Sequence, residues 1–118
     1  MVDFSKIQQD VFAFRDERDW SRFHTPKELA AGLAIEAAEL KQEFLWKSDP
    51  EIQEYLESKK GHRAVSDEIA DVVIYAILAA EACGVNLEAA ITKKLEKNRE
   101  KYPVEKAKGS SKKYTELS

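Results

Sequence analysis

The chain has 118 residues, a length that favours one domain with a single core. Its residues are 43% hydrophobic and 35% charged, which excludes an intrinsically disordered chain, and its formal net charge of -3 excludes a strongly basic surface for nucleic acid or membranes. No apolar run approaches the roughly 20 residues of a membrane span, and the amino end shows no signal-peptide pattern. The single cysteine, Cys83, has no partner for an internal disulfide, so we expect a packed thiol in a reduced, cytoplasmic protein.

The first predicted helix covers residues 4–18, where apolar side chains recur at helical spacing. A loop with two aromatic residues follows. The next helix start is marked by Thr25 as the N-cap, by Pro26 at the first helical position and by Glu28 as the closing residue of a capping box. We predict that this second helix continues to about residue 46 or 47.

Three further helices follow in the sequence. "SDP" opens a short third helix, which we expect Gly61 to end, and the fourth helix is predicted over residues 63–82. The fifth begins after the N-cap residue Asn86 and ends near Tyr102. No segment shows strand-like alternation, so the predicted fold is an all-α bundle of about five helices.

We predict two regions in the chain: a domain over residues 1–104, and a flexible, lysine-rich tail over residues 105–118 that lacks helical periodicity. The second and fourth helices are apolar on more than one face. In the second, for example, Leu33 and Phe44 lie on one stripe, whereas Ile35 covers the opposite side. Such helices must be covered on several sides, and five short helices leave too little cover, so we expect a homo-oligomer.

Each of these two apolar helices also carries a row of acids. Glu36, Glu39 and Glu43 recur at spacings of three and four in the second helix, and Glu68 and Asp71 do so in the fourth. Carboxylates that face one another in a low-dielectric environment repel and require cations. Magnesium prefers oxygen ligands and retains waters and phosphates in its shell, so these rows predict a Mg²⁺ site.

Two other interpretations of the acidic rows are possible, and the sequence favours neither over a magnesium site. A solvated charge row paired with Lys41 and Lys47 is the usual arrangement on a surface helix, but here apolar residues flank the row and a second helix repeats it. A ferritin-like di-iron site expects a Glu-x-x-His motif on each of two helices. Because His24 and His62 fall in or beside predicted loops, a di-iron site is disfavoured.

The fifth helix places Lys94 and Asn98 on its apolar stripe, one turn apart. They point either at an anion and a polar group held over the metal ions, or outward as a snorkelling lysine near a helix end. Spacing alone does not choose between these two interpretations.

Three segments together resemble a known family: "WSRFHTPKELAAGLAIEAAELKQEFLWK", "DEIADVVIYAI" and "KKLEKNREKYP". They are similar to the MazG-like all-α nucleoside triphosphate pyrophosphohydrolases, and most of all to the dCTP pyrophosphatase branch. The resemblance implies Mg²⁺-dependent hydrolysis of a deoxynucleoside triphosphate to its monophosphate and pyrophosphate by a homotetramer. It also implies site residues: Glu36, Glu39, Glu68 and Asp71 as metal ligands, Trp20, His24, Trp46 and Tyr75 around the base and sugar, and Lys94 and Asn98 toward the phosphates or sugar.

Two positions depart from the pattern of the resembling family. Ile35 stands where the wider superfamily often has a further glutamate, which suits the dCTP-type branch and removes that position as a catalytic base. Val11 stands where a polar contact to the base is expected, so base preference is expected to be looser. The proton of the attacking water would pass to Glu39 or to Glu43, and spacing does not decide which.

Two functions compete with a pyrophosphatase that prefers dCTP or a 5-modified dCTP. One is a broad house-cleaning activity on several deoxynucleoside triphosphates. The other is a non-catalytic helical assembly module, in which the acids are structural and the apolar helices serve only oligomerisation. Chelation of divalent metals separates the last from both enzymes, because only an enzyme would lose turnover.

Overall fold

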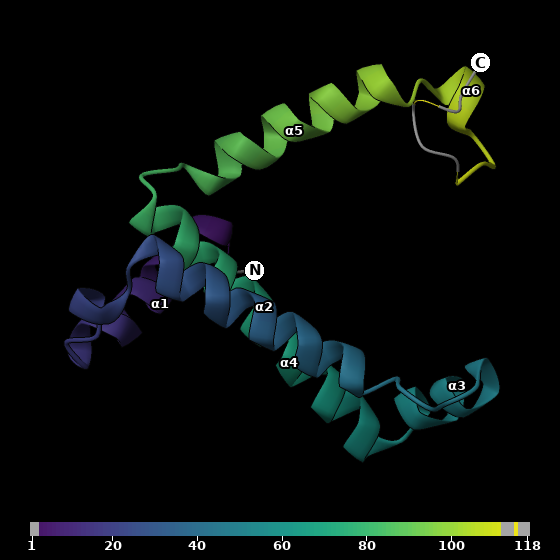
Figure 1. Cartoon of the computed structure of the whole chain (residues 1–118), viewed down its shortest axis with the longest axis horizontal. Helices are drawn as coiled ribbons and strands as arrows, with labels where there is room; N and C mark the ends of the chain where they lie inside the picture. Colours follow the sequence, from purple (N-terminus) through teal and green to yellow (C-terminus); the bar gives the residue numbers. More distant parts are fainter. Residues whose placement is uncertain (1–2, 112–114, 116–118) are drawn as a thin grey trace. The chain divides into compact units, whose positions relative to one another are not determined.

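The computed structural model describes residues 3–111 and 115. Within these residues the secondary structure is entirely helical, which confirms the all-α prediction. The chain divides into two compact units, Met1–Gly84 and Val85–Ser118, which are described separately. Figure 1 labels the helices, whose bounds are α1 Phe4–Glu17, η1 (a 3₁₀ turn) Ser21–Phe23, α2 Pro26–Gln42, α3 Asp49–Glu57, α4 Lys59–Ala82, α5 Leu87–Lys101 and α6 Val104–Ala107.

The helix starts follow capping chemistry. Thr25 Oγ1 accepts a hydrogen bond from the backbone N–H of Glu28 at 3.3 Å, with Pro26 at the first helical position, which confirms the predicted N-cap of α2. Of the predicted capping box, only this half is present among the hydrogen bonds of the described residues. Asn86 caps α5 in the same way through the N–H of Ala89 at 3.1 Å. A reciprocal capping box starts α3, where the side chains of Ser48 and Glu51 each bond the backbone of the other.

The predicted end of the second helix at residue 46 or 47 is wrong, because α2 stops at Gln42 and residues 43–46 form turns. Trp46 adopts a left-handed backbone conformation with φ 65°, which no α-helix accommodates. The ammonium of Lys47 donates to the carbonyl oxygen of Glu43 at 2.8 Å and so satisfies one of the acceptors that the helix end leaves free.

The prediction that Gly61 ends the third helix is also wrong, since Gly61 lies in the first turn of α4. α3 ends at Glu57, and Ser58 alone separates the two helices; its Oγ accepts from the N–H of Gly61 at 3.0 Å and donates to the carbonyl oxygen of Tyr55 at 2.6 Å. A Cβ on Gly61 would lie 2.0 Å from that carbonyl oxygen. Gly61 is therefore required by the close approach of α3 to α4 and not by a helix stop.

The unit Met1–Gly84 is built on α2 and α4, which run side by side in opposite directions, with α3 at the end where they are joined (Figure 1). α4 makes its most extensive contacts with α2, and smaller ones with α3 and α1. Few side chains of the described residues are buried, and the apolar ones among them are Leu29, Val65, Ile77 and Leu78. This core joins α2 to α4 and leaves much apolar surface exposed on both helices.

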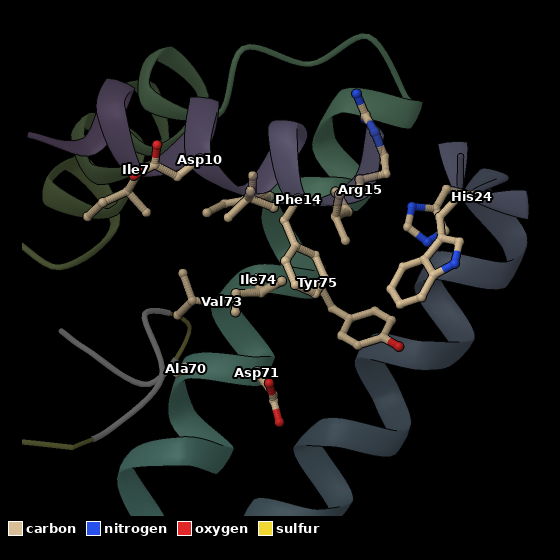
Figure 2. A pocket seen from close by; sticks show the side chains of 14 residues that line it. Ile7, Asp10, Phe14, Arg15, His24, Ala70, Asp71, Val73, Ile74 and Tyr75 are labelled. Carbon is tan, nitrogen blue, oxygen red and sulfur yellow. The ribbon is translucent and has the colours of Figure 1, made fainter. Parts of the chain in front are cut away.

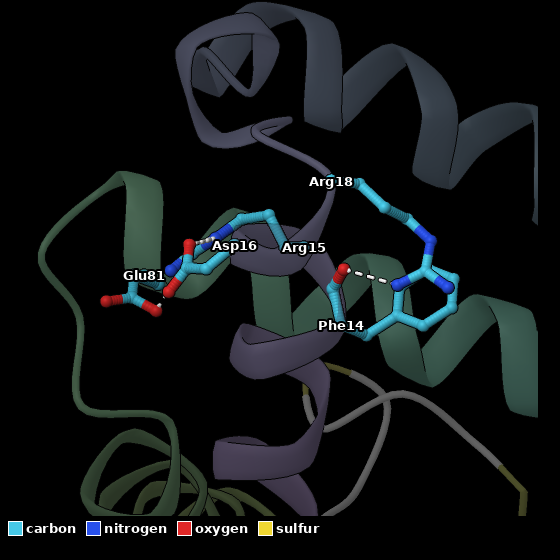
Figure 3. Close-up of polar contacts among 5 residues, drawn as sticks. All are labelled: Phe14, Arg15, Asp16, Arg18 and Glu81. Atoms are coloured by element: carbon cyan, nitrogen blue, oxygen red, sulfur yellow. Dashed lines mark hydrogen bonds and ion pairs between the residues drawn. The ribbon is translucent and has the colours of Figure 1, made fainter.

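An arginine fastens α1 to the far end of α4. Arg15 donates from Nε to Asp16 at 2.8 Å and from Nη1 to Glu81 at 3.2 Å, as Figure 3 shows. The Arg15 side chain is only 14% exposed, and the hydrogen bond that it donates to Asp16 raises the pKa of its guanidinium. Arg15 thus stays charged while it closes the α1–α4 interface.

The unit Val85–Ser118 contains α5 and α6. α5 ends at Lys101, close to the predicted end near Tyr102. The short α6 occupies the beginning of the predicted tail, and the rest of the tail lies partly outside the described residues. Cys83, at the C-cap of α4, is exposed, so the prediction of a packed thiol is wrong. Among the described residues no helix combines the length and apolar character needed to cross a bilayer.

Replacing Gly61 with alanine should destabilise the fold. An alanine normally stabilises a helix relative to glycine, but here its Cβ would collide with backbone atoms of α3 that have little freedom to move. We expect the free energy of unfolding, measured with urea, to fall by about 1–3 kcal/mol. Lys60→Ala, at the exposed neighbouring position, should leave it nearly unchanged. A Gly61→Ala variant more stable than the parent protein would contradict the close approach.

Candidate active site

Three glutamates from the two central helices converge. Glu36 and Glu39 project from α2 and Glu68 from α4, and one carboxylate oxygen of each lies within 4.8 Å of the others. The convergence follows from helix geometry: each acid row is a straight line along its helix, and the antiparallel packing of α2 on α4 brings the rows together.

The glutamate cluster is electrostatically strained in the absence of a cation. Glu36 Oε2 and Glu68 Oε2 are buried atoms that have no hydrogen-bond partner within residues 3–111 and 115. Burial raises the pKa of Glu36, and the hydrogen bond and charge of Glu39 raise it further. Burial likewise raises the pKa of Glu68, followed by the charge of Glu39 and smaller contributions from Asp71 and Glu43. Two orphaned oxygens and a purely carboxylate donor set fit a hard divalent cation such as Mg²⁺.

Asp71 and Glu43 lie near the cluster but outside the group of three. The charge of Asp71 raises the pKa of both Glu36 and Glu68, and its side chain also lines the neighbouring cleft. Glu43, just beyond the end of α2, accepts a hydrogen bond at Oε1 from the hydroxyl of Tyr55 on α3. Lys47, which the solvated-row interpretation paired with the acids, instead contacts the Glu43 carbonyl and the Tyr55 ring.

A cleft of about 600 Å³ lies between α1 and α4 and reaches Asp71. Its walls are mostly apolar, and Figure 2 shows α1 supplying Phe14 on one wall, α4 supplying Ile74 and Tyr75 on another, and His24 at one end. The cleft has the size of a small-molecule site and opens beside a residue of the acidic rows. It brings together four of the predicted site residues: Trp20, His24, Asp71 and Tyr75.

The position of Trp20 depends on a stack of side chains. The rings of Trp20 and Phe14 meet edge to face with centroids 5.8 Å apart, and the guanidinium carbon of Arg18 lies 3.7 Å from the Phe14 ring centroid. Arg18 is held over that ring by a 2.9 Å hydrogen bond from Nη1 to the Phe14 carbonyl oxygen (Figure 3). Trp20 therefore lines the cleft while 44% of it stays exposed, so part of its aromatic surface is accessible to a ligand.

His24 and Tyr75 shape the polar end of the cleft. His24 Nδ1 is a buried atom with no hydrogen-bond partner among the described residues, so a ligand group could bond it. Tyr75 packs against the backbone of α2 at Gly32, where a Cβ would lie 2.3 Å from its ring. The missing side chain at Gly32 thus allows the ring to lie between the cleft and α2.

The remaining predicted site residues lie elsewhere. Trp46 is 96% exposed and does not line the cleft. Lys94 and Asn98 lie in the other unit, where they line one shallow depression on α5 together with Ile91 and Leu95. The side-by-side placement of Lys94 and Asn98 on one face of α5 agrees with their helical spacing.

Four contributors to the site were not predicted from the sequence: Tyr55, Gly32, Phe14 and Arg18. A glycine in the interior of a helix, such as Gly32, is a recognisable sign of close packing. Phe14 lies in the first helix, and the spacing of its apolar residues does not show that Phe14 also supports Trp20.

Known proteins resemble this chain in both sequence and structure. A sequence model of the MazG-like family matches residues 32–117. Rat and human dCTP pyrophosphatase 1 are each 41% identical over 104 residues, which cover 88% of this chain and 61% of theirs, so the chain spans about three fifths of the length of these relatives. The crystal structure of a pyrophosphatase from Archaeoglobus fulgidus matches with a TM-score of 0.74 and 42% identity, covering 84% of this chain and 91% of that one. The predicted resemblance is confirmed, and the chain belongs to the MazG-like family.

Proposed function

We propose that the protein hydrolyses deoxynucleoside triphosphates to the monophosphate and pyrophosphate, with Mg²⁺ as cofactor. The observation that carries the proposal is the cluster of Glu36, Glu39 and Glu68, with two orphaned buried oxygens, beside an apolar cleft large enough for a nucleoside. The names of the relatives, dCTP pyrophosphatase 1 and pyrophosphatase, support the same reaction class.

Glu36, Glu39, Glu68 and Asp71 would hold the metal. When bound, Mg²⁺ offsets charge on the phosphate oxygens and lowers the pKa of a coordinated water. The carboxylates fix the position of the triphosphate relative to that water, which is most of what phosphoryl transfer asks of a protein. Glu39 or Glu43 would take the proton of the attacking water; the hydroxyl of Tyr55 occupies one oxygen of Glu43 and leaves the other available.

The cleft would receive the base and sugar. Trp20 and Tyr75 present aromatic surfaces, and the unpaired Nδ1 of His24 offers a hydrogen bond to the base or the sugar. Trp46 remains a proposed substrate contact, as an indole that the chain itself leaves uncovered. Lys94 and Asn98 remain proposed contacts to the phosphates or sugar.

Among substrates we propose dCTP or a 5-modified dCTP, with a role in cleaning the cytoplasmic nucleotide pool. Broad activity on several deoxynucleoside triphosphates is the second candidate, favoured by Val11, an apolar residue in the cleft wall where a polar contact to the base was expected. A non-catalytic assembly module is a third, which the unpaired buried carboxylate oxygens argue against.

We also propose that the protein is a homotetramer. Apolar side chains of the central helices remain exposed in the single chain, including Ile35 at 59%, Ile69 at 49% and Val73 at 43%. Large contiguous apolar surfaces usually mark protein–protein contacts, and a second copy of the chain would cover them.

The carboxylates are tested by single neutral substitutions. Glu36→Gln, Glu39→Gln, Glu68→Gln and Asp71→Asn should each lower kcat/KM by about 100-fold or more, since each removes a charged metal ligand. Their metal-free melting temperatures should equal or exceed that of the parent protein, because repulsion within the cluster is relieved. Glu54→Gln on α3 serves as the control and should retain full activity.

The same assay separates an enzyme from an assembly module. EDTA should abolish pyrophosphate release, and added Mg²⁺ should restore it. If all four variants turned over substrate at near-normal rates, the metal site would have been assigned to the wrong residues.

Sugar selectivity is a separate expectation. A ribose 2′-hydroxyl against the mostly apolar wall of the cleft would lose its water without gaining a partner, so kcat/KM for dCTP should exceed that for CTP by about tenfold or more. Trp46→Ala should raise KM for dCTP more than it weakens Mg²⁺ binding. Equal values for dCTP and CTP would contradict the sugar argument, and a purine optimum would contradict the dCTP assignment.

The oligomer is tested by light scattering coupled to size-exclusion chromatography. At micromolar concentration the mass should correspond to a tetramer, or at least to a dimer. Ile69→Glu, which places a charge on the exposed apolar face of α4, should reduce that mass. An active protein that elutes as a compact monomer would contradict the proposal.

A further inference from the structure

Tyr55 on α3 makes a hydrogen bond into the acidic row of α2. Its hydroxyl donates to Glu43 Oε1, and Glu43 continues the row of Glu36 and Glu39 just past the end of that helix. The Lys47 ammonium lies 4.5 Å from the centroid of the Tyr55 ring and bonds the Glu43 carbonyl oxygen at 2.8 Å. Glu43 is therefore held at both its side chain and its backbone.

Tyr55 itself is anchored to the other acid-bearing helix. The Ser58 hydroxyl donates to its carbonyl oxygen at 2.6 Å, and Gly61 in the first turn of α4 approaches the same oxygen so closely that no Cβ would fit. Its backbone thus lies against the first turn of α4, the helix that carries Glu68, while its hydroxyl reaches the end of α2. One side chain fixes the spacing between Glu43 and α4.

Glu43 is placed to act on the carboxylate cluster without belonging to it. It lies outside the group of three whose oxygens converge within 4.8 Å, and one of its own oxygens is occupied by the Tyr55 hydroxyl. The other, Oε2, takes no part in that hydrogen bond. Carboxylates that bond a water or a ligand side chain around a metal site commonly tune its affinity without touching the ion.

We propose that Tyr55 is a positioning residue, which holds Glu43 beside the metal site as an outer carboxylate that accepts a hydrogen bond from a water of that site. The inference rests on the proposed metal site of Glu36, Glu39, Glu68 and Asp71. It goes beyond that site by giving α3 a part in it: the α3–α4 junction sets the orientation of the Glu43 carboxylate, just past the end of α2.

A double-mutant cycle in the binding of Mn²⁺, followed by isothermal titration calorimetry on the whole protein without nucleotide, tests the inference. Tyr55→Phe removes the hydroxyl and keeps the ring that Lys47 contacts. Glu43→Gln keeps the shape of the side chain and removes the charge. We expect Glu43→Gln to weaken Mn²⁺ binding by about tenfold and Tyr55→Phe by about threefold or more, while Tyr55→Phe has no further effect in the Glu43→Gln background.

Two controls separate positioning from a structural role. Glu54→Gln removes a charge from the same helix and should leave Mn²⁺ affinity within about twofold of the parent value. kcat for pyrophosphate release from dCTP should follow the same non-additive pattern, whereas KM should change little. A structural role would instead lower the melting temperature and add its full effect on Mn²⁺ affinity in the Glu43→Gln background.

The outcomes are distinguishable from failure of the proposed function. Additive effects on Mn²⁺ affinity, or a Tyr55→Phe variant with parental affinity, would overturn the role of Tyr55 even in an active enzyme. Non-additive effects in a protein that releases no pyrophosphate would support the role of Tyr55 and overturn the reaction. A parent protein that binds no Mn²⁺ would overturn both.

Discussion

The packing of α2 on α4 is the contact on which the rest of the structure depends. It buries Leu29 and Ile77 almost completely, and in the same step it brings Glu36 and Glu39 against Glu68. The apolar contacts drive the association and the acids oppose it, since buried like charges repel. The free energy gained by burying apolar side chains thus offsets the repulsion among the three glutamates. Such destabilising clusters are typical of functional sites.

Two glycines allow site residues to pack closely against the central helices. Gly32 admits the ring of Tyr75 against α2, and Gly61 admits the backbone of Tyr55 against α4. Each lies in a helix, where glycine is unfavourable by about 1 kcal/mol relative to alanine. The absence of a side chain at each position allows a tyrosine of a neighbouring helix to pack closely there. The aromatic residue at each place carries a hydroxyl, one at the cleft and one at the acidic row.

Much of this could be predicted from the sequence, and the failures have specific causes. The helices and most of their starts follow from periodicity and from caps such as Thr25 and Asn86, which are local signals. The end of α2 and the place of Gly61 could not be predicted, because both depend on contacts with a neighbouring helix. The spacing of the acids along each helix predicts the two rows, and their convergence shows that the acidic faces of α2 and α4 lie opposite each other. The hydrogen bond from Tyr55 to Glu43 joins two different elements, so the spacing within one helix does not predict it. The exposed position of Trp46 could not be predicted, because helical periodicity extends past the end of α2 to this residue, whose positive φ excludes it from the helix.

Ser58 has a consequence for the way the protein opens. It is at once the residue that ends α3 and the N-cap of α4, so no linker separates the two helices. If α3 detaches, the Ser58 hydroxyl no longer bonds the Tyr55 carbonyl oxygen and is less well placed to accept from the N–H of Gly61. The first turn of α4 then loses its cap, so α3 and this turn should exchange their amide hydrogens as one cooperative unit. Such an opening would release the hydroxyl of Tyr55 from Glu43 before it disturbs Leu29 and Ile77. Within the unit Met1–Gly84, α3 should therefore fluctuate locally while α2 and the rest of α4 stay folded.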